Sequence, residues 1–261
     1  MNEFRRLLPQ VTDVAREVGE GLRERRSGIP ATGPDVASVI EAFDEVDRPA
    51  VALLRERLGA VRPRAVWAPD EVGTMVGARG ETWVCDAVDG AVQFLRGLPH
   101  WGVSITLVAD ARPVLAVLYA PQLDILYTAA EGAGARLNGR PVTTSSKTLA
   151  AALACTSQPP HNLEPERAGA SLTGMLRRAL VVRNLGPTSL QVAQVGSGHV
   201  DVFWEYGRDV NNLLPGSLIA REAGAVVTDA AGAPWRLDSS SFVAAAPSVH
   251  REVMEVLAAV G

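Results

Sequence analysis

Near the start of the chain, apolar side chains recur every three or four positions. The residues on this apolar face are Leu8, Val11, Val14, Val18 and Leu22. Such spacing places them on one side of a helix, so we predict a helix over residues 5–26. No apolar run in the chain approaches the roughly 18 residues that a membrane-spanning helix needs.

A second helical pattern covers residues 36–59, after the Gly- and Pro-rich stretch SGIPATGPD. Pro49 lies inside this pattern, and an interior proline removes a backbone hydrogen bond. We therefore expect a break, with a new helix that begins near Asp47 and ends at Gly59.

From residue 64 to residue 138, apolar and polar positions alternate with a period near two, which predicts strands. The candidates are VWAPDE, TWVCDAV, WGVSITLVAD, RPVLAVLYAP and ILYTAAEG. The stretch ADAR, between the third and the fourth, is expected to form a hairpin turn. GAGARLNGRPV is expected to form a loop.

The second half of the chain alternates between strand and helix patterns. We expect strands at 152–157, 180–186, 200–207, 225–232 and 241–247. Helices are expected at 189–198 and at 214–224, the second ended by Gly224, and a last helix has Ser248 as its N-cap.

This order of elements predicts an α+β fold in which sheets and helices form layers. Residues 1–140 would supply the N-terminal helices and an antiparallel sheet that carries the metal-binding motif. Residues 141–261 would form a C-terminal α/β half, packed with the first into one compact unit.

Composition narrows the classes of function. The chain has 261 residues, is 47% hydrophobic and 21% charged, and carries a net charge of −4. An acidic chain is not expected to bind nucleic acid, and it needs a metal or backbone amides to hold an anion. Cys85 and Cys155 lie in apolar strand patterns and are expected to be buried thiols. With no secretory signal, we expect a cytoplasmic protein that binds no membrane.

The main chemical candidate is the motif DAVDG at the end of the strand TWVCDAV. A chain that turns sharply at Gly90 lets Asp86 and Asp89 converge, with the carbonyl of Val88 between them. Oxygen donors in this arrangement suit a hard cation such as Mg²⁺, which commonly shares a substrate phosphate.

Two further acidic features accompany this motif. Asp70 and Glu71 follow another strand pattern, and Asp47 stands at the expected helix start. Each feature alone is also typical of a solvated turn or a helix N-cap. Together they favour a site in which two or three metal ions polarise a phosphoryl group and activate a water.

These motifs resemble, in order and over almost the whole chain, the inositol monophosphatase family. Its first signature, W-x-x-D-P-I-D-G-T-x-N-F with G-x-P and V-S-I-x-L, is matched by Trp83, Asp86, Asp89, Gly90, Phe94, Gly97, Pro99 and VSITL. LYAPQLDILYTAAEGAGARLNGRPV, LGPTSLQVAQVGSGHVDVFWE and PGSLIAREAGAVVTD resemble later segments of the family.

The resemblance implies a layered αβαβα sandwich of the inositol monophosphatase and fructose-1,6-bisphosphatase type. It also implies a Mg²⁺-dependent, lithium-sensitive phosphatase that forms a homodimer. The implied metal ligands are Asp70, Asp86, Val88 through its carbonyl, Asp89 and, by an ungapped alignment, Asn212. The implied catalytic acids are Asp47 and Glu71, and the implied substrate contacts are Gly90, Ala91 and Glu205.

Three positions depart from the family pattern at the implied centre. Ala91 replaces a threonine whose hydroxyl helps to orient the attacking water, a loss that costs roughly 10²–10⁴ in rate. Asn212 replaces a carboxylate ligand, so the site loses a negative charge and should hold Mg²⁺ less tightly. A gapped alignment would give that role to Asp209. Pro187 replaces a serine.

We therefore expect a phosphatase that hydrolyses a small phosphate monoester of a cyclitol, sugar or nucleotide. Ala91 and Asn212 leave two alternatives open. One is a catalytically inactive relative that binds a phosphorylated ligand or a protein partner, and the other is an enzyme with altered chemistry in specialised biosynthesis.

Overall fold

The structure is a computed structural model that describes residues 3–26, 33–68, 79–158 and 164–260. Its helices are α1 (Glu3–Arg25), α2 (Val36–Val61), α3 (Ala91–Leu95), α4 (Pro165–Leu176), α5 (Thr188–Gly196), α6 (Val210–Glu222), α7 (Pro247–Ala258) and the short 3₁₀ turn Leu149–Ala151. Its strands are β1 (Val66–Trp67), β2 (Glu81–Asp89), β3 (Gly102–Ala109), β4 (Arg112–Ala120), β5 (Ile125–Ala130), β6 (Ala135–Leu137), β7 (Arg140–Pro141), β8 (Leu153–Thr156), β9 (Val181–Arg183), β10 (Val202–Tyr206), β11 (Val226–Thr228) and β12 (Ser241–Ala245).

The two N-terminal helices form as their apolar periodicity predicts, with one correction. In α1 the buried face contains Val11, Val14, Val18 and Leu22. The expected break near Asp47 is wrong, because α2 continues through Pro49 and past Gly59 to Val61. Pro49 is exposed, so water can hydrate the carbonyl that its missing N–H leaves unpaired. Phe43 and Val46 before the proline pack against the core, and Ala50, Leu54 and Leu58 after it are buried there, so packing stabilises the helix on both sides of Pro49.

The first sheet has seven strands in chain order, β1-β2-β3-β4-β5-β6-β7. Only the pair β1–β2 is parallel. The predicted hairpin at ADAR is confirmed, because Ala109 pairs with Arg112 around two residues with positive φ. The predicted loop over 132–142 is wrong, because β6 and β7 form a hairpin there. Asn138 and Gly139 at its tip have positive φ, as this tight turn requires.

The second sheet has five strands in the order β11-β12-β10-β8-β9. Strands β8, β9 and β10 are parallel, and β12 runs antiparallel to β10 and to β11. All five predicted strands are confirmed. Helix α6 begins at Val210, earlier than expected, and α4 is an additional helix. Ala246 rather than Ser248 is the N-cap of α7, because Pro247 takes the first helical position, where its fixed φ suits the helix.

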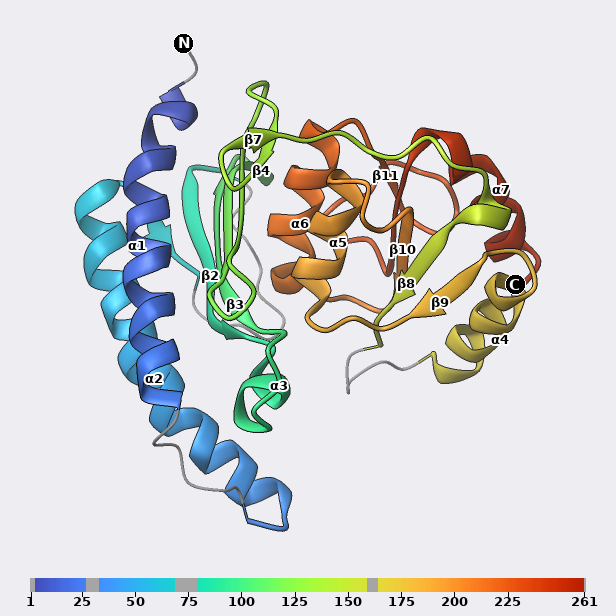
Figure 1. The fold of residues 1–261 in the computed structure, drawn as a ribbon. Helices are drawn as coiled ribbons and strands as arrows, with labels where there is room; N and C mark the ends of the chain where they lie inside the picture. The colour runs from blue at the N-terminus through green and yellow to red at the C-terminus, as the bar shows by residue number, and fades with distance from the viewer. Residues whose placement is uncertain (1–2, 27–32, 69–78, 159–163, 261) are drawn as a thin grey trace.

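Helices and sheets alternate in five layers, which confirms the predicted αβαβα sandwich (Figure 1). Helices α1 and α2 cover the outer face of the first sheet. Helices α5 and α6 lie between the two sheets, and α4 and α7 cover the far face of the second sheet. No helix within the described ranges combines the length and the apolarity needed to cross a bilayer.

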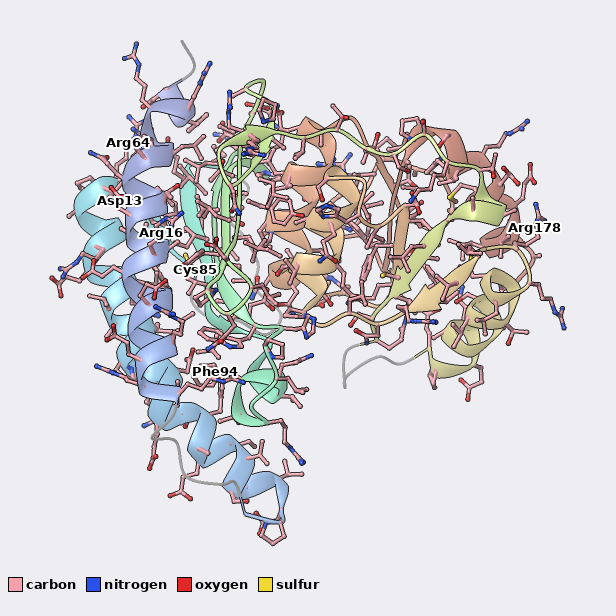
Figure 2. The ribbon with its side chains drawn as sticks, viewed as in Figure 1. Asp13, Arg16, Arg64, Cys85, Phe94 and Arg178 are labelled. Carbon is pink, nitrogen blue, oxygen red and sulfur yellow. The ribbon has the colours of Figure 1, made fainter. Side chains whose placement is uncertain are left out.

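The apolar core is divided among the four interfaces between these layers. One cluster joins α1 and α2 to the first sheet and includes Trp83 and Leu54. Cys85, which belongs to the same cluster, lies between these helices and the sheet (Figure 2). Two clusters join α5 and α6 to the two sheets. The fourth joins the second sheet to α4 and α7. Both cysteines are buried and form no disulfide, as predicted.

Candidate active site

Strand β2 ends in a bulge that brings two acids to the same face of the first sheet. Asp86 pairs with Ser104 and Asp89 with Gly102, so three steps along β2 lie opposite two steps along β3. Because residues two apart on a strand share a face, Asp86 and Asp89 do so as well. The backbone N–H of Val88 donates to Asp86 Oδ1 at 2.9 Å within this bulge. One extra residue, rather than the glycine alone, therefore places the two carboxylates together.

Gly90 follows the bulge and makes a sharp, tightly packed turn into α3. Its φ is +90°, a conformation that strains residues with a side chain. A Cβ on Gly90 would lie 2.7 Å from Pro187 Cγ and 3.0 Å from the carbonyl oxygen of His100. The turn therefore packs directly against the loop before α5. Ala91 is the first residue of α3, which has only five residues.

The first turn of α5 supplies two buried hydroxyl groups. Ser189 Oγ donates to Asp89 Oδ2, and Thr188 Oγ1 donates to Glu205 Oε2 at 3.3 Å. Glu205 lies near the end of β10, so this turn connects the acid of the first sheet with an acid of the second. The start of a helix carries partial positive charge, which favours carboxylates at this position.

The loop that leads into α5 is held by the side chain of Gln191. The backbone N–H of Leu185 donates to Gln191 Oε1 at 3.0 Å, and Gln191 Nε2 donates to the carbonyl of Gly186 at 2.8 Å. Gln191 is fully buried. These bonds fix the residues that precede Thr188 and Ser189 and thereby fix where the two hydroxyls lie.

The buried Asp89 and Glu205, together with the half-buried Asp209, form what we call the buried acid cluster. Burial raises the pKa of Asp89 to about 7, and the charge of Asp209 acts in the same direction, while the Ser189 hydrogen bond opposes it. Burial and the neighbouring Asp209 raise the pKa of Glu205 well above its usual range. Burial also raises the pKa of Asp209. Ionising all three acids together is therefore unfavourable unless a positive charge is added.

Asp209 and Asn212 occupy the start of α6. Asp209 is the N-cap of the helix, and Asn212 Nδ2 donates to its Oδ1 at 2.8 Å. Asp209 lies close enough to Asp89 and Glu205 to raise the pKa of both. The amide of Asn212 thus supports a carboxylate three residues earlier, the residue that the gapped alignment favours.

The donor set of this region fits a hard cation in one respect and is incomplete in another. The carboxylates of Asp86 and Asp89 share a face, and no hydrogen-bond donor reaches the buried Oε1 of Glu205 within the described residues. Oxygen donors and surplus negative charge suit Mg²⁺, which takes remaining ligands from water and substrate. In the described ranges, however, no group of three His, Cys, Asp or Glu side chains is arranged as a metal site. Asp70 and Glu71 lie outside the described residues.

Asp47 lies within α2, away from any helix end. Its Oδ1 is buried and has no hydrogen-bond partner among the described residues. Burial raises the pKa of Asp47 to about 6, and the charge of Asp44 adds to this effect. Helix α2 contacts α3, whose first residue, Ala91, offers only a methyl group. Because of this burial and the charge of Asp44, the carboxylate of Asp47 is more basic than that of an ordinary aspartate.

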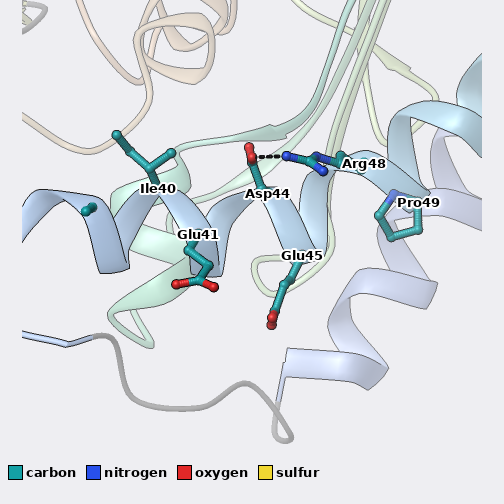
Figure 3. A pocket seen from close by; sticks show the side chains of 7 residues that line it. Ile40, Glu41, Asp44, Glu45, Arg48 and Pro49 are labelled. Atoms are coloured by element: carbon teal, nitrogen blue, oxygen red, sulfur yellow. Dashed lines mark hydrogen bonds and ion pairs between the residues drawn. The ribbon is translucent and has the colours of Figure 1, made fainter.

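A hollow of about 670 Å³ lies on the exposed side of α2 and is separate from the acid cluster (Figure 3). Its lining includes Ile40, Glu41 and Glu45, together with the ion pair of Asp44 and Arg48. None of its lining residues belongs to the buried acid cluster. We do not assign the candidate site to this hollow.

The main residues that sequence reasoning missed are Thr188, Ser189 and Gln191. The stretch PTS before an apolar helix is typical of a helix start, where hydroxyl groups cap backbone N–H groups. That pattern gives no indication that the hydroxyls contact carboxylates, since Asp89 is 100 residues away from Ser189. The polar Gln191 among the apolar residues of this helix could have indicated a buried hydrogen-bond network near the site.

Comparisons with known proteins agree with this architecture. The model of the inositol monophosphatase family matches residues 5–260. Inositol-1-monophosphatase of Rhizobium meliloti (strain 1021) is 33% identical over 218 residues, which cover 82% of this chain and 81% of that protein. A putative Nus factor SuhB of Neisseria meningitidis serogroup B is 29% identical over 262 residues, with 99% of each chain covered.

Solved structures give the same result. An IMPase of Thermotoga maritima superposes with a TM-score of 0.81 at 26% identity and covers 96% of each chain. SuhB of Mycobacterium tuberculosis superposes with a TM-score of 0.81 at 28% identity, covering 100% of this chain and 99% of that one. With a family match that spans nearly every residue and the predicted fold confirmed, the chain belongs to the inositol monophosphatase family.

Proposed function

We propose that this protein is a divalent-cation-dependent phosphatase that hydrolyses a small phosphate monoester. The observation that carries the proposal is the placement of Asp86 and Asp89 on one face of the first sheet, beside the buried Glu205 and the half-buried Asp209. Membership of the family supports the reaction class. The similarity to an inositol-1-monophosphatase makes a cyclitol phosphate the first substrate to test.

The proposed cation ligands are Asp86, the carbonyl of Val88 and Asp89. Asp70, which the family resemblance implies as a further ligand, lies outside the described residues. We assign the next carboxylate to Asp209 rather than to Asn212, because the charge of Asp209 reaches Asp89 while Asn212 donates to Asp209. When bound, Mg²⁺ would supply positive charge that polarises the phosphoryl group and lowers the pKa of a coordinated water.

The remaining roles belong to side chains. Glu205 presents Oε1, which no donor reaches in the described part of the chain, to a hydroxyl of the alcohol moiety. Asp47, with its raised pKa, and Glu71 would accept protons near the attacking water. Gly90 and Ala91 would place backbone amides against the phosphate. Since α3 has only five residues, its dipole contributes little to this contact.

The proposal is tested with purified protein freed of metal by a chelator. On addition of excess Mg²⁺, we expect inorganic phosphate to be released from inositol 1-phosphate or from another member of a panel of sugar and nucleotide monoesters. Asp86→Asn should abolish the release, because it removes one of the two paired carboxylates. Absence of any release by the wild-type protein across the panel would refute hydrolysis.

A second candidate function is binding without turnover, and Ala91 is the observation that favours it. No hydroxyl stands at position 91 to orient a water, and several relatives are named Nus factor SuhB rather than phosphatase. Such a protein would bind Mg²⁺ and phosphate in calorimetry and release no product. The double variant Ala91→Thr with Asn212→Asp separates the two cases, because gain of turnover in it alone would show that the wild-type residues prevent catalysis.

The expected homodimer, the cytoplasmic location and the absence of a nucleic-acid partner remain predictions. The Nus-factor names of the SuhB relatives make a partner in transcription worth testing beside the small-molecule substrates. Light scattering of the purified chain tests the dimer directly.

A further inference from the structure

The first turn of α5 carries a contact that has no role in the function proposed above. Ser189 is fully buried, and its hydroxyl donates to Asp89 Oδ2. The two residues come from different layers, since Asp89 ends β2 of the first sheet and Ser189 belongs to a helix between the sheets. The contact therefore fixes the rotamer of a carboxylate on one element by a hydroxyl on another.

We propose that Ser189 is a positioning residue that orients Asp89 for cation binding. The inference rests on the proposed function, because it takes Asp89 as a ligand of the divalent cation. A carboxylate with a free torsion loses conformational freedom when it binds a metal, and a hydrogen bond to one oxygen removes that freedom in advance. The hydrogen bond from Ser189 thus holds Asp89 Oδ2 in place. It thereby sets the orientation of the carboxylate relative to the neighbouring acids.

The surroundings of Ser189 are themselves rigid. Gln191 holds the loop before α5 through Leu185 and Gly186. Pro187 packs against Gly90, the residue directly after Asp89. Both the donor and the acceptor are therefore attached to backbone that has little room to move, as a positioning role requires.

A purely structural role would have a different consequence. The hydroxyl would then only satisfy a buried carboxylate, and its removal would lower stability without a specific effect on metal binding. Ser217 provides the matched control, because it is also a fully buried helical serine, and its hydroxyl donates to the carbonyl of Leu214 in α6.

The test measures Mn²⁺ binding to the full-length, chelator-treated protein by isothermal titration calorimetry, with thermal unfolding recorded for each variant. We expect Ser189→Ala to weaken Mn²⁺ binding by about ten- to a hundredfold, the usual effect of removing a group that orients a metal ligand. Ser189→Thr, which keeps the hydroxyl, should bind more tightly than Ser189→Ala. Ser217→Ala should bind as the wild type does. If Ser189→Ala does not fold, Ser189→Cys replaces it, since the thiol is similar in size and a much weaker donor.

The outcomes separate this inference from the proposed function. If the wild type and Ser189→Ala bind Mn²⁺ equally, Asp89 needs no positioning by Ser189 and the inference is wrong while the cation site stands. Equal weakening in Ser189→Ala and Ser217→Ala would also overturn it, in favour of a general stability effect. If the wild type binds no Mn²⁺, the cation site fails, and the role of Ser189 fails with it.

Discussion

Asp89 shows at the scale of one residue how the fold prepares an acid for a cation. Burial raises its pKa to about 7, while Ser189 donates a hydrogen bond that favours the ionised form. A nearby cation would reverse the balance, because opposite charge stabilises the carboxylate.

The raised pKa of Asp89 predicts how the stability of metal-free protein depends on pH. Between its usual pKa, near 4, and about 7, the folded state keeps a proton that the unfolded state releases. The contribution of Asp89 to the free energy of unfolding should therefore decrease as pH rises through this range, and this contribution should change no further above it. Thermal unfolding of chelator-treated protein at pH 5 and pH 7.5 measures the effect.

Asp89→Asn should reduce this pH dependence and the stabilisation by Mg²⁺ at pH 7.5. An amide neither titrates nor repels Asp209, so the variant loses one contribution while those of Glu205 and Asp209 remain. Asp238→Asn, at a highly exposed position, is the surface control and should behave as the wild type does. Parallel pH profiles for the wild type and Asp89→Asn would contradict the prediction.

At the scale of elements, the site depends on two loops that pack against each other. The turn from β2 into α3 contacts the loop from β9 into α5 through Gly90 and Pro187. The motif DAVDG predicted the first loop, and its glycine suits the positive φ. The second loop was noted only for Pro187 in place of serine. The side chain of Pro187 packs against the Gly90 turn. The second loop therefore contacts the end of the first sheet at the acid cluster.

Gly90→Ala should destabilise the protein more than Gly224→Ala. Both glycines have φ near +90°, and the alanine penalty for that conformation is about 1–2 kcal/mol. Only at Gly90 does a Cβ also collide, at 2.7 Å from Pro187 Cγ, whereas nothing lies within 4 Å at Gly224. Overpacking adds about 1–3 kcal/mol. Urea unfolding measures the loss of stability in both variants. Equal losses would show that the two loops can move apart to accommodate a Cβ at position 90.

The elements themselves were largely predictable, and the errors have physical causes. Most strands and the amphipathic α1 follow from periodicity. The continuous α2 was missed because packing of Phe43 and Val46 against the core keeps the chain helical before Pro49 and outweighs the local cost of the proline. The hairpin of β6 and β7 was missed although Asn138 and Gly139 carry its turn signal, because the strands are too short to show alternation.

At the scale of the whole molecule, the middle layer joins the two sheets. Helix α6 contacts β4 and β5 of the first sheet and β11 and β12 of the second. Its residues Leu218 and Ile219 pack in a cluster with the first sheet, while Leu213 and Leu214 belong to a cluster that contains residues of both sheets. We infer that residues 1–140 and 141–261, although they carry separate sheets, form one cooperative unit.

The shared layer predicts that both sheets unfold together. Amide exchange in increasing urea should show β4 and β10 losing protection at the same concentration. Leu218→Ala should shift both by the same amount, with a loss of about 2–5 kcal/mol for a buried leucine. If β4 opens at lower urea while β10 stays protected, the two halves are independent domains.

The sequence by itself determined the layered α+β class, most of the strands and the motif that supplies Asp86 and Asp89, because these depend on local periodicity and on residues close together in the chain. Only the tertiary structure decided that Ser189 and Asp209 join Asp89. Ser189 is 100 residues from Asp89 in the chain and Asp209 is further still. These residues meet because apolar faces of α5 and α6 pack between two sheets. Burial then set the pKa of each acid, which no local pattern encodes.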